Sequence, residues 1–213
     1  MLLRKNDVIV FQGDSVTDAG RLRDGTEWGN GYPAMVGGTL KSLYADYNLT
    51  VYNRGIGGNR VEHLVERWKT DTLDLEPTLV TLLIGVNNVW HSYVKEDVAY
   101  NINRFEEDLL TVVEKTIHRG ARLVMLEPFA FHHDVFPEAW RERLYEIQQV
   151  VRKTAMRYAD AYIPLEGIFY QEALRWGNRM ESNGALRLSA DGVHPTAEGH
   201  RLIAREVLKV LTE

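Results

Sequence analysis

Short apolar segments alternate along the chain with longer segments in which apolar residues recur at helical spacing. Apolar runs of this length are too short for helices and predict buried strands. The strongest of them is apolar except for one threonine, as expected for a central parallel strand that is covered on both faces. The predicted strands span residues 8–11, 50–52, 79–84, 123–126 and 161–164.

Between these strands, apolar residues recur at intervals of three, four and seven positions, which predicts helices with one buried face. Helices are predicted over 32–43, 61–73 and 102–117, after Pro137, between the fifth strand and residue 176, and over 195–211. Five strands alternating with helices predict a three-layer α/β/α fold around a parallel, doubly wound, flavodoxin-like sheet. The whole chain, residues 1–213, is expected to form a single domain.

The composition and charge of the chain argue against several classes of function. Hydrophobic residues at 45% and charged residues at 26% are ordinary for a soluble globular protein. The net charge of −5 gives no electrostatic case for binding nucleic acid or an anionic membrane, and no segment has the length of an apolar membrane span. With no cysteine, disulfides and thiolate chemistry are excluded. A cytoplasmic location is expected because no signal peptide core follows the first residues, and a homo-oligomer is compatible with the sequence.

A serine follows the first predicted strand, at the sheet edge where open α/β folds present reactive groups. Gly13 ends the apolar run, and Ser15 comes two residues later. A serine nucleophile needs a base, a group that orients the base, and donors for the developing oxyanion. The alternative is an ordinary polar turn, in which Asp14 or Ser15 caps the next helix.

A histidine near the start of the last predicted helix is the candidate base. Asp191 precedes His194 by three residues, a spacing that lets a carboxylate reach the Nδ1–H of the ring. Such a contact fixes the tautomer and stabilises the imidazolium, leaving Nε2 to face Ser15. The alternative is a helix entrance in which Asp191 is only a turn residue.

Two residues after the second and third strands are candidate oxyanion donors. Gly58 lies in a glycine-rich turn, where a backbone N–H can approach a ligand closely. Asn87 adds an amide donor after the third strand. Each could be a simple turn residue. Their occurrence together with Ser15 and Asp191-x-x-His194, at strand ends in this order, favours a catalytic site.

These segments resemble, in order, the four sequence blocks of the SGNH (GDSL-type) hydrolase family. The resemblance implies the SGNH hydrolase fold, with Ser15 as nucleophile, His194 as base and Asp191 as the residue that orients His194. It also implies an oxyanion hole made by the N–H groups of Ser15 and Gly58 and by the Asn87 side chain. The mechanism uses water, so no cofactor and no metal is implied. The blocks here are Gly13-Asp14-Ser15, Asn53-Arg54-Gly55-Ile56-Gly57-Gly58, Gly85-Val86-Asn87-Asn88 and Asp191-Gly192-Val193-His194-Pro195.

Within that family the chain is most similar to the bacterial carbohydrate (acetylxylan-type) acetyl esterases, through residues 29–32, 53–55 and 89–90. Two positions depart from the pattern. Asn88 stands where an aspartate is usual, which puts an accessory hydrogen bond in question. Ala190 stands where that branch often has a tryptophan, which would open one wall of the pocket. Trp90 and Asp14 are candidate substrate contacts.

The sequence therefore predicts a serine esterase that removes short acyl groups, above all acetyl, from a small-molecule ester or an acetylated oligosaccharide. A thioesterase or lysophospholipase is the first alternative, with an acyl groove lined by Tyr32, Met35, Phe129 and Phe131. A carbohydrate-binding protein without catalysis is the second. The pair His132-His133 lacks a third ligand at useful spacing, so a solvated loop is favoured over a metal site. The family resemblance implies that this loop borders the cleft, where it could contact the substrate.

Overall fold

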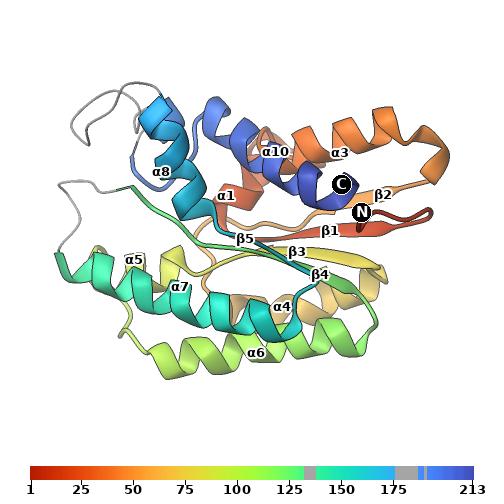
Figure 1. Ribbon diagram of the computed structural model, residues 1–213. Helices are drawn as coiled ribbons and strands as arrows, with labels where there is room; N and C mark the ends of the chain where they lie inside the picture. Colours follow the sequence, from red (N-terminus) through yellow and green to blue (C-terminus); the bar gives the residue numbers. More distant parts are fainter. Residues whose placement is uncertain (132–137, 176–186, 190) are drawn as a thin grey trace.

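The computed structural model describes residues 1–131, 138–175, 187–189 and 191–213. Its middle layer is a parallel sheet of five strands in the order β2-β1-β3-β4-β5, as the sequence predicts (Figure 1). The predicted strand positions are confirmed to within two residues at each end. The strands are β1 (Val8–Gly13), β2 (Thr50–Asn53), β3 (Leu79–Leu83), β4 (Arg122–Leu126) and β5 (Ala161–Ile163).

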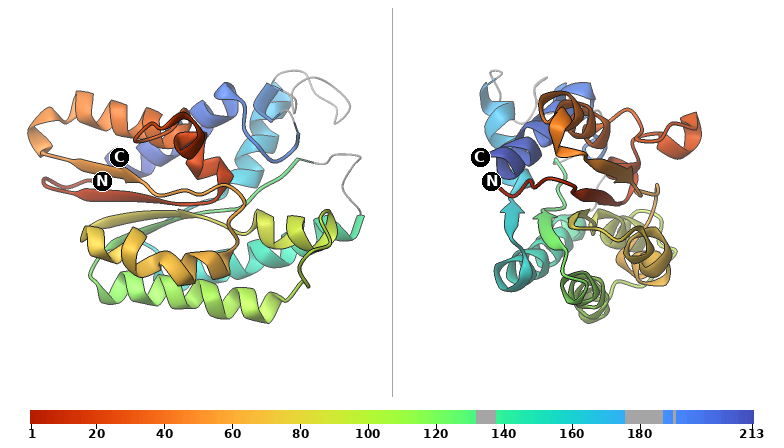
Figure 2. Two further views of the ribbon diagram at one scale, coloured as in Figure 1. Left: turned by 180° about the vertical axis from the view of Figure 1, so that it is seen from behind. Right: turned by 90° about the vertical axis from the view of Figure 1, so that its right-hand side faces the viewer.

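Helices cover both faces of the sheet and complete the predicted three layers (Figures 1 and 2). One face carries α1 (Ser15–Asp18), α3 (Tyr32–Leu43), α8 (Leu165–Arg175) and α10 (Ala197–Thr212). The other carries α4 (Val61–Asp71), α5 (Val86–Tyr93), α6 (Ile102–His118) and α7 (Glu138–Tyr158). Shorter elements are α2 (Arg21–Asp24) and two 3₁₀ turns, η1 (Ala45–Tyr47) and η2 (Leu73–Leu75).

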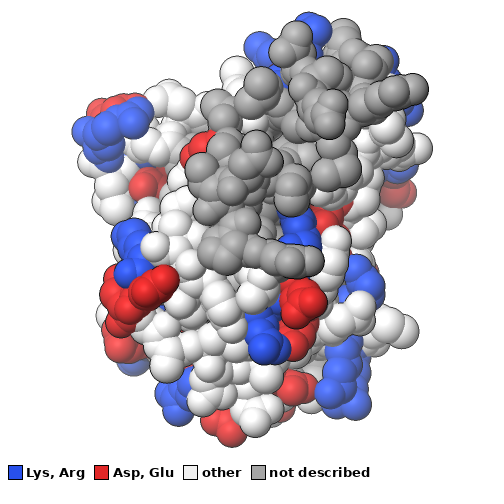
Figure 3. Space-filling view, turned by 90° about the vertical axis from the view of Figure 1, so that its left-hand side faces the viewer, with Lys and Arg blue, Asp and Glu red and all other residues white. Residues whose placement is uncertain are grey.

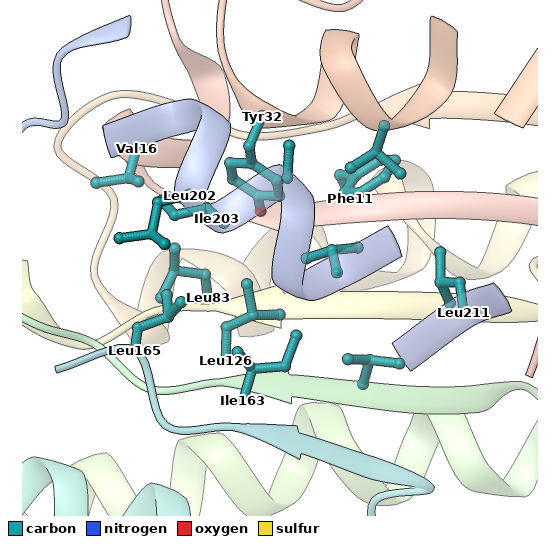
Figure 4. Close-up of a cluster of buried hydrophobic side chains, with 14 of the residues drawn as sticks. Phe11, Val16, Tyr32, Leu83, Leu126, Ile163, Leu165, Leu202, Ile203 and Leu211 are labelled. Atoms are coloured by element: carbon teal, nitrogen blue, oxygen red, sulfur yellow. The ribbon is translucent and has the colours of Figure 1, made fainter. Parts of the chain in front are cut away.

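The unbroken apolar run of β3 serves two cores. Leu79 and Leu83 belong to the cluster beneath α3 and α10, whereas Val80 and Leu82 belong to the cluster on the opposite face. Successive side chains of a strand point to opposite faces, so a strand between two helical layers must be apolar at nearly every position. Figure 4 shows the first cluster, in which Tyr32 lies between the helices and the sheet.

Three helices of the described chain are not indicated by its sequence pattern. Asn87 and Asn88, which could have been simple turn residues, form the first turn of α5. The segment after β1, in which no helix was predicted, contains α1 and α2. Asparagine favours turns over helix interiors, which obscured the start of α5. The two helices near the N-terminus contain four residues each, too few to show helical periodicity.

Parallel register brings the turns after β1, β2 and β3 to one edge of the sheet. Asn53 pairs with Phe11, and Leu83 pairs with Gly13. The segments that follow these strands are those singled out as chemical candidates. Figure 3 views the molecule from this edge, where Lys and Arg are interspersed with Asp and Glu over the described surface.

Among the helices that the structure describes, none is both long enough and apolar enough to span a bilayer.

Candidate active site

Ser15 is the first residue of α1, immediately after the turn that ends β1. Asp14 is the N-cap of this helix, and its Oδ1 accepts a hydrogen bond from the Val16 N–H at 3.0 Å. A Cβ at position 13 would lie 2.4 Å from the carbonyl oxygen of Leu83, so only glycine lets the helix start this close to β3. The sharp strand-to-helix turn therefore presents the Ser15 hydroxyl at the carboxyl edge of the sheet.

The three predicted residues of the triad are hydrogen-bonded in sequence. Ser15 Oγ lies 2.9 Å from His194 Nε2, and His194 Nδ1 lies 2.6 Å from Asp191 Oδ2. The other carboxylate oxygen, Asp191 Oδ1, accepts the N–H groups of His194 at 2.7 Å and Val193 at 2.9 Å. The short turn that carries both residues is thus closed on itself, which fixes the ring orientation that a general base requires.

This turn is held by two further contacts that the sequence analysis did not identify. Ser189 Oγ donates to the carbonyl oxygen of His194 at 2.8 Å. The Phe131 N–H donates to the carbonyl oxygen of Gly192 at 2.8 Å and ties the turn to the segment after β4. A serine two residues before Asp191 was the only sequence signal for the first contact.

The electrostatic interaction between Asp191 and His194 favours a histidine that accepts a proton. Partial burial acts against ionisation of Asp191, but hydrogen bonds from the His194 ring and from the His194 and Val193 N–H groups outweigh it and hold the Asp191 pKa far below its usual range. The hydrogen bond to Asp191 raises the pKa of His194 against the opposing effect of burial, and the negative charge of Asp191 adds to it. The imidazolium is the form that the carboxylate stabilises.

The candidate oxyanion donors surround the turn after β2. Gly58 has φ of 77°, a left-handed conformation that favours glycine. A Cβ on the adjacent Gly57 would lie 3.9 Å from Ser15 Cβ, which places this turn beside the nucleophile. Asn87 is buried in the first turn of α5, and its Nδ2 donates to the carbonyl oxygen of Asn59 at 3.1 Å. The turn after β2 and the amide after β3 therefore meet next to Ser15.

The structure corrects the suggestion that Asp14 contacts substrate. Its side chain is 1% exposed, and its carboxylate caps α1, which is the alternative role considered from the sequence. Burial raises the pKa of Asp14 to about 7, although the Val16 N–H and the charge of His194 oppose this. Asp14 therefore supports the start of α1 and does not line the cavity beside Ser15.

Asn88 makes the kind of contact that its departure from the family pattern put in question. Its Oδ1 accepts the Val61 N–H at 3.2 Å at the start of α4, and its Nδ2 donates to Glu62 at 3.0 Å. An aspartate at this position would place its charge against the Glu62 carboxylate. Trp90, the other candidate substrate contact, is partly buried and packs against the core on the α4–α7 face, so stacking on a sugar stays a prediction.

Two of the sequence-based suggestions concern residues that the structure does not describe. These are Ala190, with its open pocket wall, and the His132-His133 pair with its substrate contact. In the part of the chain that is described, no group of three or more His, Asp or Glu side chains is arranged to hold a metal ion.

A cavity of about 480 Å³ opens beside Ser15 and His194. Its polar lining includes Asp18, Arg23 and Asn30. His200, which the sequence analysis missed, also lines it. Its burial lowers its pKa to about 4, and its Nδ1 accepts the Tyr32 N–H at 3.2 Å, so this ring is neutral.

The side chains suggested for an acyl groove lie elsewhere. Tyr32, Phe129 and Phe131 are at most 3% exposed and belong to the core beneath α3 and α10. Met35 packs against the same core and lines a different groove, between α3, α8 and α10. None of these four residues lines the cavity at Ser15.

Comparison with known proteins agrees with this geometry. The profile of the GDSL-like lipase/acylhydrolase family matches residues 11–202. An acetylxylan esterase from Geobacillus stearothermophilus is 29% identical over 225 aligned positions, which cover 98% of this chain and 95% of that protein.

Solved structures show the same fold. The crystal structure of Axe2, an acetylxylan esterase from Geobacillus stearothermophilus, superimposes with a TM-score of 0.85 at 27% identity and covers 100% of this chain and 97% of its own. LAE5, an alpha/beta hydrolase enzyme from the metagenome of Lake Arreo, superimposes with a TM-score of 0.86 at 25% identity, and both chains are covered completely (100%).

Proposed function

Because the chain belongs to the GDSL-like lipase/acylhydrolase family, we propose that it is a serine esterase that removes acetyl groups from carbohydrate hydroxyls. One observation carries the proposal. The Ser15 hydroxyl lies 2.9 Å from an imidazole whose other nitrogen is held by a carboxylate at 2.6 Å. This is the arrangement that turns a weak alcohol nucleophile into a reactive one.

The reaction follows from the roles of these groups. Ser15 Oγ attacks the ester carbonyl carbon while His194 Nε2 takes the hydroxyl proton, and Asp191 stabilises the imidazolium. The tetrahedral oxyanion accepts hydrogen bonds from the Ser15 and Gly58 N–H groups and from Asn87. His194 then protonates the departing alkoxide. A water molecule, deprotonated by the same ring, releases acetate from the acyl-serine.

The cavity beside Ser15 supports a polar leaving group. Asp18, Arg23 and Asn30 offer charged and amide groups to hydroxyl-rich substrates. The aromatic side chains that could have accepted a long acyl chain are buried in the core instead. The similarity to an acetylxylan esterase over 98% of the chain supports the same choice. An acetylated oligosaccharide is therefore favoured over a thioester or a lysophospholipid.

A carbohydrate-binding protein without activity is disfavoured, because a binding site has no need of the complete hydrogen-bonded triad.

Two substrate series test the proposal. With p-nitrophenyl esters, kcat/KM is expected to be highest for acetate and to fall beyond butyrate. Acetylated xylo-oligosaccharides should release acetate at a rate that Ser15→Ala abolishes. A rise in kcat/KM toward octanoate would instead support the lipase-like alternative, and the absence of any hydrolysis would support the binding protein.

A further inference from the structure

Arg67, in the middle of α4, joins two turns that the active site draws on. Its Nε donates to Asn59 Oδ1 at 2.8 Å, its Nη1 to the carbonyl oxygen of Arg54 at 2.8 Å, and its Nη2 to that of Gly13 at 3.3 Å. We propose that Arg67 is a positioning residue that sets the oxyanion hole relative to the nucleophile. This inference rests on the proposed esterase activity.

The three acceptors lie on both sides of the site. Gly13 is the last residue of β1 and is followed by Asp14 and Ser15. Arg54 and Asn59 flank the turn after β2 that contains Gly58. One rigid guanidinium thus spans the turn that carries the nucleophile and the turn that carries an oxyanion donor, and fixes the separation between them.

Asn59 extends the same chain of contacts to the second oxyanion donor. Its side chain accepts from Arg67, and its backbone carbonyl accepts from Asn87 Nδ2 at 3.1 Å. A shift of Asn59 would therefore move the Gly58 N–H and release the Asn87 amide together. Because oxyanion donors act over hydrogen-bond distances, a displacement of about 1 Å is enough to weaken catalysis strongly.

The contacts of Arg67 suit an arginine better than a lysine. The Arg67 side chain is 14% exposed, and Asp71, one turn further along α4, accepts from its Nη1 at 3.0 Å. The Asp71 backbone carbonyl in turn accepts from Gln12 Nε2 at 3.1 Å, so the pair is anchored to β1. A planar fork can reach three acceptors in different directions, whereas a lysine ammonium keeps the charge but is a single point.

The first test is Arg67→Lys in the full chain, with p-nitrophenyl acetate as substrate. We expect kcat to fall about 10- to 100-fold while KM stays near the wild-type value, because the hole acts on the transition state and not on the ground-state ester. The matched control is Arg104→Lys. On α6, Arg104 makes the same kind of i,i+4 contact, to Asp108 at 2.8 Å. Loss of this contact should leave kcat unchanged.

A double variant separates positioning from a general loss of stability. If Arg67 acts through the oxyanion hole, the kcat loss of Arg67→Lys combined with Asn87→Ala is smaller than the product of the single losses, because both changes remove the same contribution. If the two substitutions damaged the structure independently, their kcat losses would multiply instead. Asn59→Ala, which removes only the Nε acceptor, gives the same readout if Arg67→Lys does not fold, and is expected to lower kcat at constant KM.

A folded Arg67→Lys enzyme with wild-type kcat, or losses that multiply in the double variant, would overturn the inference alone. An Asn59→Ala enzyme with wild-type kcat would also overturn the inference and leave the proposed function intact. Wild-type protein that fails to hydrolyse p-nitrophenyl acetate would contradict the proposed function, and the inference with it.

Discussion

Ser15 Oγ and His194 Nε2 lie 2.9 Å apart although 179 positions separate the two residues in the chain. The contact forms because the turn after β1 and the entrance to α10 lie on the same face of the sheet, where α10 packs along α3. The proposed nucleophile and its proposed base are thus brought together by the first and last thirds of the fold, and four predictions follow from their surroundings.

Asn87→Ala removes the side chain that we propose as a donor of the oxyanion hole. Loss of one such donor typically lowers kcat by roughly 10²–10³-fold, and we expect this range here with KM little changed. Steady-state kinetics with p-nitrophenyl acetate measure both parameters. An Asn87→Ala enzyme with near wild-type turnover would exclude Asn87 from the hole.

The neighbouring asparagine provides the control. Asn88 caps α4 and contacts Glu62, so Asn88→Ala should lower the free energy of unfolding by about 1 kcal/mol, as the loss of a cap does. Its effect on kcat should be far smaller than that of Asn87→Ala. Urea unfolding and the same kinetic assay distinguish the two residues.

Asp191→Asn tests the carboxylate that orients His194. We expect kcat to fall on the order of 10⁴-fold because an amide favours the wrong tautomer. The hydrogen bond to Asp191, and then the charge of Asp191, raise the pKa of His194, and the base works in its neutral form, above that pKa. Without the charge the His194 pKa falls, so the acidic limb of the pH profile of kcat/KM should move to lower pH.

Another histidine–carboxylate pair serves as the control. His91 Nδ1 lies 2.9 Å from Asp97 Oδ1, in a contact that no step of the mechanism uses. Asp97→Asn should leave both kcat and the acidic limb in place. An acidic limb that stays at its wild-type position in Asp191→Asn would show that another group titrates there.

His200→Gln tests the neutral histidine beneath the site. Its pKa is about 4 in the folded protein, against 6.5 for an ordinary histidine, so between these values the unfolded chain binds more protons. The contribution of His200 to stability is therefore complete above pH 6.5 and is lost as the pH falls toward 4, with a slope of at most about 1.4 kcal/mol per pH unit. Urea unfolding of wild type and variant at several pH values measures the difference.

The exposed His118 is the matched control, since its ring contacts only the Glu114 carbonyl among the hydrogen bonds described. His118→Gln shows what the same substitution does to the unfolding curves at an exposed ring outside the site. Parallel curves for wild type and His200→Gln would mean that His200 binds its proton equally well in the folded and the unfolded protein, which would contradict the lowered pKa.

The fold was predictable because each strand between two helical layers is nearly all apolar, and each long helix keeps one apolar face. The run 79–84 and the periodicity over 102–117 are clear for this reason. The short helices α1, α2 and α5 were not predictable, because they contain too few turns to show a period or begin with residues that favour turns.

For the site, Ser15, Gly58, Asn87, Asp191 and His194 could be named because their types and order carry chemistry. The contacts of Arg67, Ser189 and His200 could not be predicted from the sequence. Each joins segments through side-chain hydrogen bonds whose partners depend on the folded path of the chain, and such contacts leave no periodic or local pattern. Asp14 was misjudged for a related reason, since burial of its carboxylate depends on the packing of α1 against the sheet.

The central claim is that Ser15 carries the acyl group, and labelling with a serine-directed phosphonate tests it most directly. Intact-mass and peptide mass spectrometry should show one adduct, on Ser15, formed in step with the loss of p-nitrophenyl acetate hydrolysis, while Ser15→Ala is folded, unlabelled and inactive. A phosphonate adduct on another residue, together with a Ser15→Ala protein that still hydrolyses the ester, would contradict the account.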